Sequence, residues 1–190
     1  MYDLPTSVEI SGVEYELRNQ GDFRTILSAF AVLNDEELTK DERVLCALLI
    51  FYDVDSMDDI LAIPDMEDAV KKMFDFMNLG QPEKHGPNYK VIDWEDDAPI
   101  IISAINNVAG KEVRAESFVH WWTFMGYFMA IGESTFATVV SIRSKILKDK
   151  KLEKWERQFR NENPQYFEWN HKTADDLEAE AWLKEVWNKE

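Results

Sequence analysis

The sequence predicts a mostly α-helical protein, a single compact helical domain of about seven to nine helices with a small N-terminal β-hairpin. Three observations favour this fold. Apolar residues recur at helical spacing from residue 22 to residue 162. Residues that cap helices stand ahead of these runs. Alternation of apolar and polar residues, which is typical of strands, marks residues 7–18 near the start of the chain.

The composition limits the classes of partner. A chain of 190 residues with 45% hydrophobic residues and seven tryptophans can bury a sizeable core. Its formal net charge of −16 repels phosphates, so we expect neither nucleic acid nor a membrane as a direct partner. Cys46 is the single cysteine, which excludes an intrachain disulfide. No export signal or membrane-length apolar run is visible, so we expect a cytoplasmic protein.

The hairpin should turn at Ser11-Gly12, between the alternating runs 8–10 and 13–17. A hairpin this small is not stable alone, so its apolar face must lie on the helices. That face would carry Val8, Ile10, Val13, Tyr15 and Leu17.

The next segments carry clear signals for helix starts. Asp22 is a plausible cap, the run Thr39–Glu42 has the pattern of a capping box, and Ser56 and Asp65 precede two more helices separated by Pro64. The helix after Asp22 should turn inward Phe23, Ile26, Leu27, Phe30 and Ala31. The helix after Asp65 should turn inward Met66, Ala69, Val70, Met73, Phe74 and Met77.

Residues 79–90 contain two glycines and two prolines and read as a linker. Each half alone would expose broad apolar faces, so this linker is not taken as a domain boundary. We assign residues 1–150 to a helical domain that includes the hairpin at 7–18. Residues 151–190 form a charged, tryptophan-containing helical C-terminal extension.

The second half begins with a helix over 93–109, whose start Pro99 can delay to Ala98, and which Gly110 ends. Residues 120–131 are apolar almost all round, which predicts a central helix surrounded by protein. Further helices are expected after Ser134 or Thr135, over 148–162 and over 174–188. The residues expected in the core include Leu48, Trp121, Trp122, Phe124, Phe128, Phe136 and Val140.

Candidate catalytic and metal-binding residues have structural explanations. The carboxylates of Asp93–Asp97 lack the glycine of a calcium loop and suit a helix start. His85, His120 and His171 lack zinc-ligand spacing, and His120 should be a packed, hydrogen-bonded side chain. No nucleophile elbow, phosphate-binding loop, dinucleotide turn or cysteine pair is present. We therefore expect no enzyme activity, no catalytic residues, no cofactor and no bound metal.

Aromatic residues crowd the charged C-terminal region, where they either form an interface or dock the tail onto its own core. The segment 164–190 is too polar for a core helix but carries tryptophans. As a hypothesis, this segment contacts the partner or a second copy of the chain. The residues proposed for that contact are Trp169, Leu177, Trp182, Val186 and Trp187.

Several blocks resemble one family. They are Leu4–Thr6, Val8–Ile10, Gly12-Val13 and Asp22–Thr25, then Glu42–Leu45 through Phe51-Tyr52, Asp93–Ala98 with Ile100-Ile101, His120–Trp122 with Phe124 and Phe128, and Glu133–Phe136 leading to Ile142-Arg143. Together, from Leu4 to about Leu152, they resemble the phage "gene product fifteen" family of Gram-positive bacteria and their prophages.

The resemblance implies a role in tail assembly, because the family's gene typically precedes the tape-measure gene. That position is similar to that of tail assembly chaperones, which coat the tape-measure protein and recruit tail-tube subunits. We therefore expect a non-catalytic chaperone in the cytoplasm of an infected or lysogenic host, with the tape-measure protein, the tail-tube protein or further copies of itself as partners. The alternatives are a minor tail protein retained in the virion and an enzyme or host-directed regulator.

Overall fold

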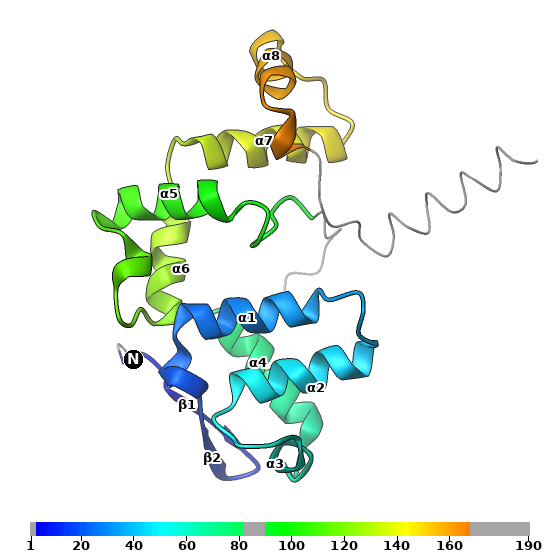
Figure 1. The fold of residues 1–190 in the computed structure, drawn as a ribbon, viewed down its shortest axis with the longest axis vertical. Helices are drawn as coiled ribbons and strands as arrows, with labels where there is room; N and C mark the ends of the chain where they lie inside the picture. The colour runs from blue at the N-terminus through cyan, green and yellow to red at the C-terminus, as the bar shows by residue number, and fades with distance from the viewer. Residues whose placement is uncertain (1–2, 82–89, 168–190) are drawn as a thin grey trace, which may run out of the picture.

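The chain folds into eight α-helices and one two-stranded antiparallel sheet within residues 3–81 and 90–167, the parts that a computed structural model describes. The predicted mostly α-helical fold with an N-terminal hairpin is confirmed. The elements are β1 (Ser7–Ile10), β2 (Val13–Glu16), α1 (Phe23–Leu33), α2 (Lys40–Phe51), α3 (Met57–Leu61), α4 (Met66–Met77), α5 (Ala98–Ala109), α6 (Trp121–Met129), α7 (Thr135–Leu147) and α8 (Lys154–Glu162). Figure 1 shows the hairpin and α1–α4 in the lower half and α5, α7 and α8 in the upper half. α6 runs between the two halves.

The hairpin forms with the predicted turn and register. Ser11 and Gly12 have φ of 51° and 80°, as a two-residue turn of this kind requires, and Ile10 pairs with Val13. Ile10 and Leu17 are buried on the expected face. Val13 lies on that face too but is 48% exposed, although its cross-strand partner Ile10 is fully buried.

The helix starts predicted from capping residues are confirmed. Each cap side chain accepts a hydrogen bond from a backbone N–H in the first turn of its helix, which satisfies a group that the helix itself leaves unpaired. The caps are Asp22 for α1, Thr39 for α2, Ser56 for α3, Asp65 for α4 and Ser134 for α7. α5 begins at the later of its two expected starts, Ala98, and ends at Gly110 with φ of 69°.

Two predictions are wrong. One concerns the buried face of α4, and the other concerns the helix expected over 148–162. Phe74 is exposed, and Phe76 is buried in its place because Ala69, Met73 and Phe76 share the face that packs on the body. The segment 148–153 is not helical: Asp149, with φ of 50°, follows the end of α7, and α8 starts only at Lys154. The last expected helix, 174–188, lies outside the described residues.

The prediction that protein surrounds the apolar segment 120–131 on all sides is also wrong. Trp121 and Phe124 of α6 are buried, but Trp122 and Phe128 are only half-buried, and Met129 at the end of the helix is 65% exposed. α6 therefore buries one face. Of the other expected core residues, Leu48 and Phe136 are buried and Val140 is half-buried.

An aromatic cluster joins the two halves. Phe23 of α1 stacks on Phe124 of α6, with ring centroids 4.4 Å apart. Trp94, which precedes α5, packs edge-on against Trp121 at 6.0 Å and lies 5.1 Å from Phe128. Because such pairs add to the stability gained by burial, this cluster fixes α1, the segment before α5 and α6 relative to one another.

The adjacent tryptophans of α6 also hold the end of α4. The indole N–H of Trp121 donates to the carbonyl of Met77 and that of Trp122 donates to the carbonyl of Phe76, both at 3.0 Å. Carbonyls in the last turn of a helix have no partner within the helix. The two side chains therefore cap α4 from a distant part of the chain.

None of the helices within the described ranges is long and apolar enough to cross a membrane.

Trp121→Ala should lower the free energy of unfolding by about 3–5 kcal/mol, because it removes a buried ring and leaves the Met77 carbonyl without its donor. Trp122→Ala should cost less, since water can enter its half-buried site. Trp155, which is 53% exposed, provides the matched control, and its change to Ala should cost no more than about 0.5 kcal/mol. Urea denaturation measures all three, and equal losses for Trp121 and Trp155 would contradict this packing.

Candidate partner-binding groove

His120 uses both ring nitrogens within the fold. Its Nδ1 accepts the backbone N–H of Trp122 at 3.0 Å, so Nε2 carries the hydrogen and donates to the carbonyl of Pro5, also at 3.0 Å. Burial lowers the pKa of His120, opposed by the Pro5 carbonyl and the charge of Asp22. With 2% exposure, this neutral imidazole is the N-cap of α6 and ties down the N-terminal segment.

Asp22 joins the segment before α6 to the start of α1. One carboxylate oxygen accepts the backbone N–H of Arg24 and caps α1, while the other accepts the backbone N–H of Val119, both at 3.0 Å. The N–H of Phe23 donates to the carbonyl of Val119 at 2.9 Å. The Arg24 guanidinium contacts both Asp22 oxygens at 3.1 Å and donates to the carbonyl of Glu116 at 2.7 Å.

The acidic segment 93–97 starts α5, as expected, and two of its carboxylates also hold the chain in place. Asp93 accepts the backbone N–H groups of Glu95 and Asp96 at 2.9 and 3.0 Å, and Lys90 lies 3.0 Å from it. Burial is the largest single effect on the pKa of Asp93 and raises it, but these hydrogen bonds and the Lys90 charge together outweigh burial and hold the pKa below its ordinary value. Within the described ranges, no group of three or more potential ligands could hold a metal ion.

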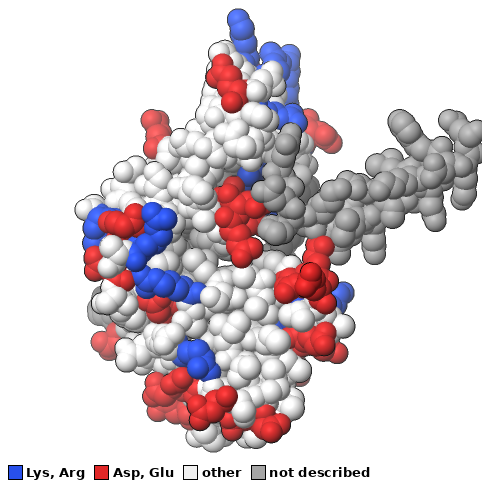
Figure 2. All heavy atoms as spheres, viewed as in Figure 1, with Lys and Arg blue, Asp and Glu red and all other residues white. Residues whose placement is uncertain are grey.

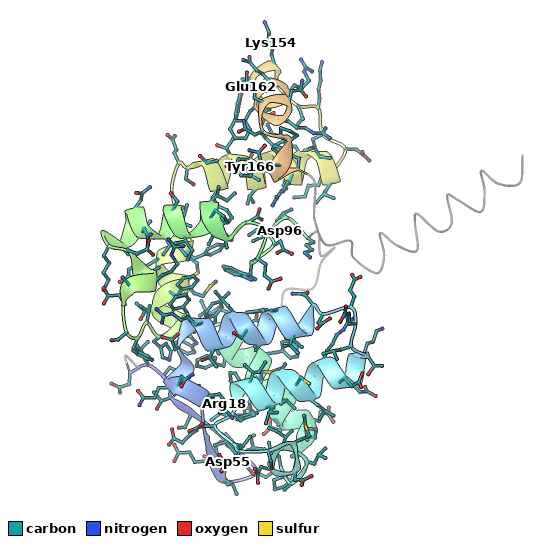
Figure 3. The ribbon with its side chains drawn as sticks, viewed as in Figure 1. Arg18, Asp55, Asp96, Lys154, Glu162 and Tyr166 are labelled. Atoms are coloured by element: carbon teal, nitrogen blue, oxygen red, sulfur yellow. The ribbon has the colours of Figure 1, made fainter. Side chains whose placement is uncertain are left out.

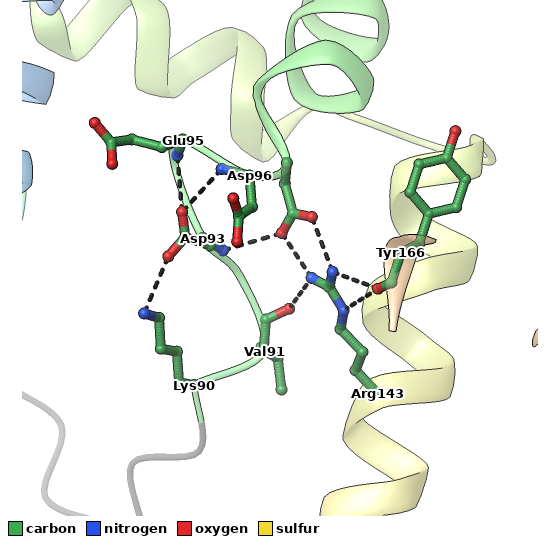
Figure 4. Close-up of polar contacts among 8 residues, drawn as sticks. Lys90, Val91, Asp93, Glu95, Asp96, Arg143 and Tyr166 are labelled. Carbon is green, nitrogen blue, oxygen red and sulfur yellow. Dashed lines mark hydrogen bonds and ion pairs between the residues drawn. The ribbon is translucent and has the colours of Figure 1, made fainter. Parts of the chain in front are cut away.

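Arg143 completes this arrangement through all five of its N–H groups (Figure 4). Its guanidinium pairs with both oxygens of the buried Asp97, at 2.6 and 2.9 Å. It also donates to the carbonyls of Val91, at 3.1 Å, and Tyr166, at 2.8 Å from Nε. Arg143 therefore fixes the segment before α5 and the turn after α8 onto α7.

Arg143 lies among the apolar residues of α7, but the sequence did not identify its role. An arginine in an apolar stripe is the available signal, since a buried arginine needs an acidic partner. Neither the spacing nor the composition identifies Asp97 among the neighbouring acidic residues as that partner.

The surface carries two adjacent hollows that meet at Thr25 of α1, and together we call them the α1 groove. Both are open to solvent. The first is lined by Asn19, Gln20, Asp22, Arg24, Thr25, Ser117 and Phe118. The second is lined by Arg18, Thr25, Ser28, Leu49, Ile50, Val54 and Asp55. The groove thus crosses α1 from the segment before α6 to the end of α2.

A strained turn forms one edge of this groove. Asn19 and Gln20 have φ of 51° and 54°, in the left-handed region that side chains other than glycine rarely adopt. The Asn19 side chain donates to the Thr25 hydroxyl at 3.0 Å, and Arg18 is held by the carbonyl of Val54. Gly21 follows with φ of 74°, where a Cβ would come within 2.8 Å of the Phe76 ring. Backbone strain of this kind clusters at functional sites.

The groove offers apolar contacts at its two ends and hydrogen-bonding groups between them. Phe118 is 45% exposed at one end, and Leu49, Ile50 and Val54 are half-buried at the other. Every buried side-chain nitrogen and oxygen in the described part of the chain has a hydrogen-bond partner. The groove therefore has the composition to bind a peptide segment, with apolar contacts in both hollows.

The sequence did not identify this groove, because its walls come from four separate segments. The residues that the sequence did nominate for partner binding, Trp169, Leu177, Trp182, Val186 and Trp187, all lie outside the described residues, and their role stays a prediction.

Arg143→Met should lower the free energy of unfolding by about 3–5 kcal/mol, because it leaves Asp97 buried without its counter-charge. The double variant Arg143→Met/Asp97→Leu should lose less than the sum of the single changes, since no lone buried charge remains. Arg160→Met, at an exposed position, is the control and should change stability by no more than about 0.5 kcal/mol. Additive losses in denaturant unfolding would contradict the pairing.

Comparison with known proteins identifies the family. No curated protein and no solved structure matches this chain. A family model described as "Bacteriophage Gp15 protein" matches residues 1–167, which includes the hairpin, all eight helices and the turn that Arg143 holds. The match reaches beyond Leu152, where the resemblance seen in the sequence ended. The chain belongs to the bacteriophage Gp15 protein family.

Proposed function

We propose that this phage protein is a non-catalytic tail assembly chaperone, and that its α1 groove binds a helical segment of the tape-measure protein. The observation that carries the proposal is this pair of hollows, which share Thr25 and offer Phe118 in one and Leu49, Ile50 and Val54 in the other. Family membership supports a phage role. The position of the family's gene, as the resemblance implies, favours the tape-measure protein as the partner.

The groove fits helix-in-groove recognition. A partner helix presents apolar side chains along one face at spacings of three and four residues. Such a face can contact Phe118 and Ile50 in turn while crossing α1 at Thr25 and Ser28. The strained turn supports recognition as well, because it holds Asn19 and Gln20 rigidly at the rim, which reduces the entropy lost on binding.

Charge contributes to selectivity in this proposal. Arg18 and Arg24 line the groove together with Asp22 and Asp55, so the groove carries both signs of charge on a chain with a net charge of −16. Such a surface attracts a partner with matching local charges and repels other acidic proteins, which affects association rate and specificity more than affinity.

The C-terminal segment supplies a second contact in the same proposal. Residues 164–190 combine two tryptophans near the end of the chain with a strongly acidic composition. The family match ends at residue 167, so Trp169, Trp182 and Trp187 lie beyond the part common to the family model. We assign this segment to the tape-measure protein, the tail-tube protein or a second copy, and the whole assembly step to the host cytoplasm.

Co-expression with the tape-measure protein tests the groove. Phe118→Glu and Ile50→Glu each place a charge at an apolar end, and each should reduce the tape-measure protein recovered in soluble complex by about tenfold. Met129→Glu is the matched control, because Met129 is 65% exposed and lies at the end of α6, outside the groove. It should bind as the wild type does.

Unfolding midpoints of the same variants separate lost binding from lost folding. Wild-type recovery with both groove variants, or an equal loss with Met129→Glu, would contradict the groove as the binding site. Mass spectrometry of purified virions tests the role itself, since a chaperone should be absent. Its presence in stoichiometric amounts would favour the minor tail protein instead.

A further inference from the structure

The basic residues of this acidic protein are concentrated at one end. Residues 143–160 hold eight of the 21 lysines and arginines but only three carboxylates. Arg143 pairs with Asp97, and Lys145 pairs with Glu156 at 2.6 Å, so these two belong to the fold. The exposed remainder is Lys148, Lys150, Lys151, Lys154, Arg157 and Arg160. We call these six residues, together with Trp155, the basic pole.

Trp155 gives the basic pole an apolar centre. It is 53% exposed, and its indole N–H donates to the Glu153 carboxylate at 2.9 Å, which orients the ring. Tryptophan and arginine are the residues most enriched where binding energy concentrates in protein interfaces. The basic pole therefore has the composition of a contact surface, with charges around one large apolar side chain.

A second surface has the complementary composition. Residues 53–68 contain seven carboxylates and no lysine or arginine. Leu61 lies among them and is 59% exposed. Some of these carboxylates also act in the fold: Asp59 completes the capping box of α3, and Asp65 caps α4. We call the surface of residues 53–68 the acidic pole.

The two poles lie at opposite ends of the molecule. Figure 3 labels Lys154 at the top of the long axis and Asp55 at the bottom. Figure 2 shows blue atoms at the upper end and again on the left side at mid-height, whereas red atoms predominate at the lower end. One copy cannot bring its own poles together, so a contact between them must join two copies.

We propose that copies of this chain associate head to tail, with the basic pole of one copy bound to the acidic pole of the next. The occupant of the basic pole is a second copy because its acidic pole offers dense carboxylates, of which Asp53 is paired with Arg18 at 3.7 Å, and an exposed Leu61 that Trp155 can contact. Nucleic acid is disfavoured, since the chain outside residues 143–160 is strongly acidic and repels phosphates. A contact between two different surfaces is heterologous, so it repeats into a chain of copies or closes into a ring.

Neutralising each pole separately tests this contact. The basic-pole variant is Lys151→Gln/Lys154→Gln/Arg157→Gln. The acidic-pole variant is Asp58→Asn/Glu67→Gln, which leaves Asp55 unchanged because Asp55 also lines the α1 groove. Sedimentation velocity of the full chain at about 0.15 M salt should give concentration-dependent assemblies for the wild type. Each variant alone should associate about tenfold more weakly.

Mixing the two variants gives the decisive result. Each retains one intact pole, so the mixture should form one-to-one dimers and nothing larger. The wild type should assemble beyond a dimer, which a symmetric dimer contact cannot produce. Glu36→Gln/Glu37→Gln/Glu133→Gln, at exposed positions outside both poles, is the matched control and should assemble as the wild type does. Raising the salt to about 0.5 M should weaken wild-type association by screening the charges.

Three results would overturn the proposal. One is a wild type that stays monomeric at every concentration. Another is unchanged association in both pole variants. The third is loss in the basic-pole variant alone, since the pole would then bind carboxylates elsewhere, such as the seven in residues 168–190, or another acidic partner. None of these outcomes bears on the α1 groove, so this proposal and the chaperone role can fail separately.

Discussion

The fold depends on the hydrogen bonds made by four consecutive residues, 119–122. The backbone of Val119 binds Asp22 at the start of α1, the ring of His120 binds the N-terminal segment, and the two indoles bind the end of α4. The hydrogen bonds of Val119 and Trp121 are buried and those of His120 and Trp122 are partly buried, so their loss would cost free energy, most of all at the two buried positions. One short segment thus holds the hairpin end, α1, α4 and α6 in a single arrangement.

The candidate groove is a consequence of that arrangement. Residues 116–119 bind Arg24 and Asp22 at the start of α1. The same residues bring Ser117 and Phe118 to the rim of the groove. Arg143 joins separate segments in the upper half in the same way, because it holds the turn at Tyr166, after α8, onto α7. The buried polar side chains of His120 and Asp97 therefore hold segments of the chain together.

The features predicted from the sequence are those set by neighbouring residues. Ser11-Gly12 specifies its turn locally, and Asp22 or Ser134 caps a helix with a group two or three residues away. The wrong predictions concern tertiary choices. Phe76 rather than Phe74 is buried because the rings of Phe51 and Trp122 pack against it. The helical spacing of apolar residues does not show where those two rings lie. The groove and the Arg143–Asp97 pair combine distant segments, so no local pattern could indicate them.

Native-state hydrogen exchange measures the central claim most directly. The N–H groups of Val119 and Trp122 donate to the buried side chains of Asp22 and His120. If residues 119–122 hold the fold together, these two amides should exchange only through global unfolding, with the same free energy of opening as Ile26 in the centre of α1. Exchange of Val119 and Trp122 through a local opening, while Ile26 stays fully protected, would contradict the account.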